Sequence, residues 1–156
     1  MSAKAWIVIV IVGLLFALAF GAMSISEVNK RKARVPKADV PTAPFTGRLS
    51  IVSIKDIRVG GYKVVLCGVS AESRLGPVGL ITEAARKSYE QSVVTCRPVG
   101  SGTPCDGKVG LKFGSALVVQ CLTSAGGDLA KEFSEKGFLC QLPSQSWAGY
   151  VACPSQ

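Results

Sequence analysis

The chain has 156 residues, a formal net charge of +8 and no histidine. This length suits one small domain with an additional segment. The absence of histidine excludes serine or cysteine nucleophiles activated by a histidine, zinc sites with histidine ligands, and the usual side chain for proton transfer near neutral pH.

The first predicted element is a membrane-spanning helix over residues 5–23, after a short N-terminus of residues 1–4. Residues 6–22 contain no charge, and a helix of this length crosses about 30 Å of hydrocarbon at about 1.5 Å per residue. A cleaved signal peptide is the alternative, because Ala17, Leu18 and Ala19 have the small-x-small pattern of a cleavage site.

A basic, proline-containing tether is predicted over residues 24–44, which have a net charge of +3. Residues 45–156 have 12 Lys or Arg and 8 Asp or Glu, a net charge of only +4. A nucleic-acid-binding protein normally concentrates its positive charge on the folded domain, so this distribution disfavours nucleic acid as the partner. The basic side chains of the tether suit anionic lipid head groups instead, and they are Lys30, Arg31, Lys32, Arg34 and Lys37.

Two features of the sequence disagree about which side of the membrane the domain occupies. The basic residues that follow the predicted helix favour a cytoplasmic domain by the positive-inside rule. Six cysteines, all beyond that helix, favour up to three disulfides and an oxidising compartment, although buried thiols are an alternative. We expect a single-pass protein whose domain is periplasmic or extracytoplasmic, with the cytoplasmic orientation as the alternative.

The folded domain is predicted over residues 45–156 and begins with strands. Strands are expected at residues 47–54, 57–59 and 62–67, and a turn at Gly60 and Gly61 joins the last two.

A helix over residues 79–92 follows these strands, with Thr82 as a candidate N-cap. Later strands are expected at residues 93–96 and 115–122, separated by a loop rich in glycine, proline and serine. Asp128 is the expected N-cap of a last helix over residues 129–136. The class is therefore mainly β, or α+β.

Several short motifs occur in a characteristic order. They are IRVGGYKVVLCGVSA at residues 57–71, a glycine-to-alanine helix start at 79–85, KFGS at 112–115, GDLA at 127–130 and GFL at 137–139. Their order and spacing resemble the thermonuclease (staphylococcal-nuclease-like) family over about residues 48–150. The resemblance implies a five-stranded OB-type β-barrel with two or three helices.

The resemblance also implies where the family's calcium ligands and phosphate-binding arginines would lie. The arginine positions hold Val65 and Ser115, the two carboxylates of the turn after the hairpin are Ser70 and Ser73, and a metal-binding aspartate is replaced by Lys55. A register slip of one residue leaves Asp56 and Glu72 as candidate ligands, but it restores neither arginine. Loss of one such cationic donor costs about 3 to 4 kcal/mol of transition-state stabilisation. We therefore predict no catalysis, no metal and no cofactor.

The cysteines have candidate partners. Cys140 and Cys153 are close together near the C-terminus, and Cys96 and Cys121 fall on strands that are neighbours in the fold implied by the resemblance. Cys67 and Cys105 then remain as the third pair.

These features predict a membrane-anchored, non-catalytic domain that acts as a protein-binding accessory subunit of a membrane complex. One alternative is an OB-type module that binds single-stranded nucleic acid or another polyanion, for which Tyr62, Phe113, Lys63 and Lys112 are the candidate contacts. A residual calcium-dependent nuclease is the third hypothesis.

Overall fold

The computed structural model describes residues 41–155. The predicted membrane helix, and the tether with its five basic side chains up to residue 40, lie outside the described residues. Within residues 41–155, no helix has the length and apolar character needed to cross a membrane.

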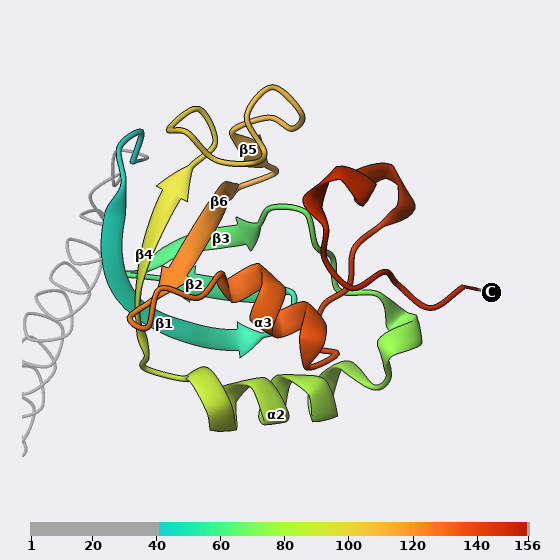
Figure 1. Ribbon diagram of the computed structural model, residues 1–156. Coiled ribbons are helices and arrows are strands. Elements are labelled where there is room, and N and C mark those ends of the chain that lie inside the picture. The colour runs from blue at the N-terminus through green and yellow to red at the C-terminus, as the bar shows by residue number, and fades with distance from the viewer. Residues whose placement is uncertain (1–40, 156) are drawn as a thin grey trace, which may run out of the picture. The chain divides into compact units, whose positions relative to one another are not determined.

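Five strands form a closed mixed barrel, and a sixth short strand extends it at one edge (Figure 1). The sheet order is β3-β2-β1-β4-β6-β5, and β3 also pairs with β6 in parallel, which closes the barrel. This architecture is consistent with the OB-type fold expected from the sequence. The strands are β1 (Phe45–Ser53), β2 (Asp56–Val59), β3 (Tyr62–Leu66), β4 (Val93–Pro98), β5 (Lys112–Phe113) and β6 (Ala116–Thr123).

The β2–β3 hairpin confirms the turn predicted from two consecutive glycines. Gly60 and Gly61 have φ values of +57° and +88°, and glycine adopts this left-handed conformation without the steric cost of a Cβ. The turn also packs closely against β1, because a Cβ on Gly47 would lie 2.6 Å from the Gly60 backbone nitrogen. The start of β1 therefore also requires glycine.

Within residues 41–155, two α-helices and two 3₁₀ helices accompany the barrel. Helix α2 (Val78–Tyr89) packs on β1, and helix α3 (Leu129–Glu135) packs on β6. The 3₁₀ helix η1 (Ser73–Leu75) precedes α2, and η2 (Pro143–Ala148) lies in the C-terminal tail. The rings of Tyr89 in α2 and Phe133 in α3 are tilted relative to each other, and each meets Phe138 edge-on, with ring centroids 5.0–6.3 Å apart.

Of the two predicted helix caps, Asp128 is confirmed and Thr82 is wrong. Asp128 caps α3 as expected, because its Oδ1 accepts hydrogen bonds from the backbone N–H groups of Ala130 and Lys131 at 2.8 and 3.3 Å. Thr82 as the cap of α2 is wrong. The helix begins at Val78, directly after Pro77, whose fixed φ suits a helix start. Thr82 lies inside the helix, where its buried Oγ1 accepts a hydrogen bond from Ile54 N at 3.0 Å.

Three disulfides join the described cysteines, in the same pairs that the sequence suggested. Cys96–Cys121 links directly opposed residues of β4 and β6 in the barrel core. Cys67–Cys105 ties the end of β3 to the loop between β4 and β5, and Cys140–Cys153 closes the C-terminal tail. Disulfides of this number in a small domain are typical of an oxidising, extracytoplasmic compartment.

Candidate functional site

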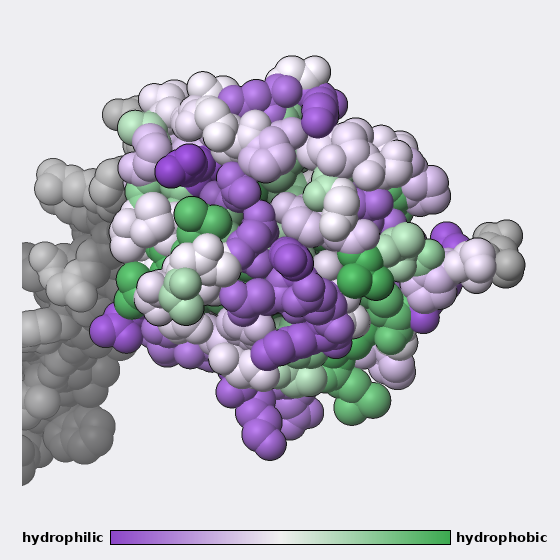
Figure 2. Space-filling model, viewed as in Figure 1, coloured by the Kyte–Doolittle hydropathy of each residue, from purple (hydrophilic) through white to green (hydrophobic). Residues whose placement is uncertain are grey.

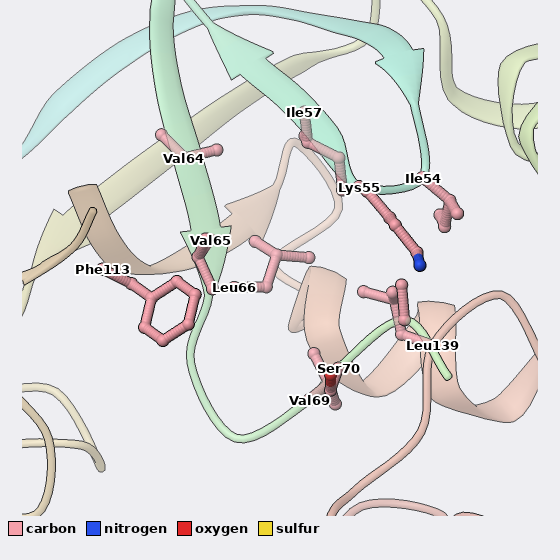
Figure 3. A pocket seen from close by; sticks show the side chains of 11 residues that line it. Ile54, Lys55, Ile57, Val64, Val65, Leu66, Val69, Ser70, Phe113 and Leu139 are labelled. Carbon is pink, nitrogen blue, oxygen red and sulfur yellow. The ribbon is translucent and has the colours of Figure 1, made fainter. Parts of the chain in front are cut away.

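An open hollow of about 270 Å³ lies where the β1–β2 turn, the end of β3 and strand β5 meet (Figure 3). Its wall is mainly aliphatic and includes Ile54, Leu66, Val69 and Leu139. These side chains belong to the barrel and to the exit of α3, so most of the wall is part of the folded core.

Three of the five positions that the sequence singled out come together in this hollow. Lys55, Val65 and Ser70 all contribute to its wall, and the extended Lys55 side chain points toward Leu139 (Figure 3). Ser73 is exposed on η1, and Ser115 is exposed in the turn between β5 and β6. Neither of these two serines belongs to the wall.

The acidic residues that a register slip would supply contact neighbouring side chains. Glu72 Oε1 accepts a hydrogen bond from the Ser70 hydroxyl at 3.4 Å. The Asp56 carboxylate accepts a hydrogen bond from Arg58 Nε at 3.2 Å and lies 3.6 Å from Lys63 Nζ. The hydrogen bond from Arg58 lowers the pKa of Asp56. Within residues 41–155, no three histidine, cysteine, aspartate or glutamate side chains gather as a metal site requires.

Phe113, which the sequence suggested only as a possible contact for single-stranded nucleic acid, is prominent in this region. Its side chain is 75% exposed although it is large and apolar, and its ring stands beside Val65 (Figure 3). Strand β5 holds it by pairing with Ala116 and Leu117 of β6. This two-residue strand was not predicted, because it is too short to show an alternating pattern, and the glycine after it was the available signal.

A second, smaller hollow of about 100 Å³ shares Phe113, Val65, Leu66 and Val69 with the first. It is bounded by Lys112 and by Gln145 of the tail. The two hollows thus lie along one apolar wall, and we call them together the Phe113 groove.

The charge of the Phe113 groove is of one sign. Its lining contains Lys55 and Lys112 and no aspartate or glutamate. Neither lysine forms an ion pair with any carboxylate among residues 41–155, whereas Arg58, Lys63 and Lys131 do. Two lysines without ion-pair partners beside aliphatic side chains give a surface suited to an apolar, negatively charged ligand.

The segment after β3, which lines the groove, packs against the C-terminal part of the chain. Ser70 and Cys140 exchange two backbone hydrogen bonds, at 2.8 and 3.0 Å. Gly68 lies so close to the tail that a Cβ there would be 2.6 Å from the Ala148 Cβ. Lys108 stands 4.4 Å from the Trp147 ring centroid. The segment that follows β3 is therefore held in place, and the groove is preformed.

The face that carries α3 differs in character, because it is mostly hydrophilic (Figure 2). Lys131 and Glu135 are exposed there and form an ion pair at 3.9 Å.

Comparisons of the chain with protein-family models, with curated proteins and with solved structures found no match. The chemistry of the site therefore rests on its own residues. Lys55 and Lys112 can bind anionic groups and the aliphatic wall can bury apolar ones.

Proposed function

We propose that this chain is a non-hydrolysing, thermonuclease-like domain that binds a protein partner as an accessory subunit of a membrane complex. A helix over residues 5–23 anchors it, the basic tether lies near anionic lipid, and the domain is on the extracytoplasmic side. One observation carries the proposal: the groove at the position of the family's active site is aliphatic and has Val65, Ser70 and Lys55 where the reaction needs arginine and carboxylates.

The composition of the groove supports a protein partner over a polyanion. Binding to a phosphate backbone depends on several cationic contacts, and the groove offers only Lys55 and Lys112 and no arginine. Apolar walls with few charges are typical of the buried centre of a protein interface. Several other cations of the domain are already engaged within it: Arg86 donates to the carbonyl oxygens of Ile51 and Val52, and Arg74 donates to Pro154 O at 2.8 Å.

Site-specific photo-crosslinking tests the proposal in cells. A photoreactive amino acid replaces Phe113 in the full chain, and the matched control carries it at Glu135 on the hydrophilic α3 face. We expect a discrete adduct with another membrane protein from position 113 only, identified by mass spectrometry after solubilisation in mild detergent. Absence of any adduct from position 113, at expression equal to that of the control, would contradict the proposal.

The single-strand binding hypothesis has one specific observation in its favour, the exposed Phe113 ring directly after Lys112. Stacking of a base on such a ring contributes about 1 to 3 kcal/mol. Titration of the purified chain with labelled oligothymidine at increasing salt discriminates the two hypotheses. Binding that weakens with salt and is lost in Phe113→Ala would favour the oligonucleotide, and calcium-stimulated cleavage would favour the residual nuclease.

A further inference from the structure

The larger hollow of the Phe113 groove has room for one bulky side chain. Sites for drug-sized ligands and cofactors occupy about 300 to 1,000 Å³, and this hollow, with about 270 Å³, lies just below that range. Its wall of Ile54, Leu66, Val69 and Leu139 can bury one aliphatic or aromatic side chain. Because burial of apolar surface is favourable, this side chain would be the apolar anchor.

The two lysines lie on different parts of the groove. Lys55 lines only the larger hollow, and Lys112 lines only the smaller one. An extended ligand that passes along the shared wall of Val65 and Phe113 therefore meets an ammonium group in each hollow. Carboxylates on both sides of the apolar anchor would complement this arrangement.

We infer that the Phe113 groove recognises an extended acidic peptide segment that inserts one bulky apolar side chain between flanking carboxylates. The inference rests on the proposed protein-binding function and specifies the chemistry of the partner. Lys55 and Lys112 bind the carboxylates, and the aliphatic wall buries the anchor.

Fluorescence anisotropy tests this recognition with a defined probe. The full chain is reconstituted in lipid nanodiscs, so that free detergent does not compete for the apolar wall. The probe is a fluorescein-labelled peptide with one Phe between Glu and Asp residues. Two further peptides carry Ala in place of Phe, or Lys in place of every acidic residue. We expect the acidic Phe peptide to bind at least tenfold more tightly than either of the others.

Charge reversal in the protein supplies the matched pair of variants. Lys55→Glu should raise the Kd of the acidic peptide at least tenfold and create binding of the Lys-flanked peptide. Lys87→Glu makes the same change of charge on the exposed face of α2, outside the groove, and should leave the Kd within twofold. Equal effects of the two substitutions, or equal binding of the Phe and Ala peptides, would overturn the inference.

The outcomes separate this inference from the function on which it rests. Crosslinking from position 113 to a membrane protein, without binding of the acidic peptide, would reject the recognition chemistry and leave the accessory-subunit proposal standing. Tighter binding of oligothymidine than of the peptide, with no crosslinked protein, would reject both.

Discussion

At Gly68 the chain leaves β3 with a φ of +85°, and the C-terminal tail packs directly on it. A Cβ at this position would lie 2.6 Å from the Ala148 Cβ and 2.7 Å from Tyr150 Cε2. We expect Gly68→Ala to lower the free energy of unfolding by about 2 to 5 kcal/mol, the sum of overpacking and a left-handed conformation. Chemical denaturation of the purified chain measures this loss.

Gly61→Ala is the matched control for that substitution. Gly61 has nearly the same φ, +88°, but nothing lies within 4 Å of an added Cβ. Only the conformational cost of about 1 to 2 kcal/mol should remain. Equal losses for the two variants would mean that the tail does not press on Gly68.

The ionisation of Tyr150 should make the free energy of unfolding depend on pH. Burial, followed by the charge of Asp128 and the 3.0 Å hydrogen bond to it, raises the pKa of Tyr150 far above its ordinary value of 10.0. Above pH 10 the unfolded chain therefore releases a proton that the folded chain keeps. The free energy of unfolding should fall as the pH rises from 10, and it should be insensitive to this group below pH 10.

Tyr150→Phe tests that dependence. The variant should be less stable at pH 8 because it lacks the hydrogen bond, by about 1 kcal/mol, but its stability should fall less steeply above pH 10. Tyr89, whose pKa burial also raises, keeps a residual slope in the variant. Denaturation midpoints between pH 8 and 11 measure the two slopes, and parallel curves would show that Tyr150 ionises equally in both states.

At the scale of elements, a buried side-chain hydrogen bond joins α2 to the turn after β1. Thr82 is 6% exposed, and its Oγ1 accepts a hydrogen bond from the backbone N–H of Ile54. Thr82→Val keeps the shape but leaves that buried N–H without a partner, so we expect a loss of about 1 to 3 kcal/mol in the free energy of unfolding. Thr82→Ser retains the acceptor and should lie closer to the parent chain. Thermal unfolding measures both, and a Val variant as stable as the Ser variant would contradict this role.

The elements that the sequence predicted well are those specified by local chemistry. The β2–β3 hairpin follows from two consecutive glycines, and the start of α3 follows from the carboxylate of Asp128. The start of α2 was misplaced because Thr82 has the side chain of a cap, yet its hydroxyl accepts a hydrogen bond from Ile54, in the turn after β1 and 28 residues away in sequence. No local pattern reports such a contact.

The candidate site was predictable only in part, for the same reason. The family resemblance brought Lys55, Val65 and Ser70 to attention, and all three line the groove. Phe113 lies on a strand of two residues, which is too short to show an alternating pattern, so its exposed position was not predicted. Gln145 reaches the groove because the tail folds back on Gly68, and a single sequence does not state that tertiary contact.

For the molecule as a whole, three disulfides fasten a small barrel, and their loops differ in length. Cys67–Cys105 spans 38 residues, Cys96–Cys121 spans 25 and Cys140–Cys153 spans 13. On the chain-entropy model each removes about 3 to 4 kcal/mol of unfolded-state entropy, most for the longest loop. Because small domains have about 5 to 15 kcal/mol of total stability, loss of all three should unfold the domain near physiological temperature.

Because the domain should need its disulfides to stay folded, the oxidation state of the six cysteines in cells tests which side of the membrane the domain occupies. In an oxidising compartment the six cysteines should resist maleimide labelling in cells denatured without reductant, and all should label after reduction. Labelling of all six without reductant would place the chain in a reducing compartment.

Among paired Cys-to-Ala variants, the one lacking Cys67–Cys105 should unfold at the lowest denaturant concentration, and the one lacking Cys140–Cys153 at the highest. A domain that stays folded in reductant would show that barrel packing alone sustains the groove.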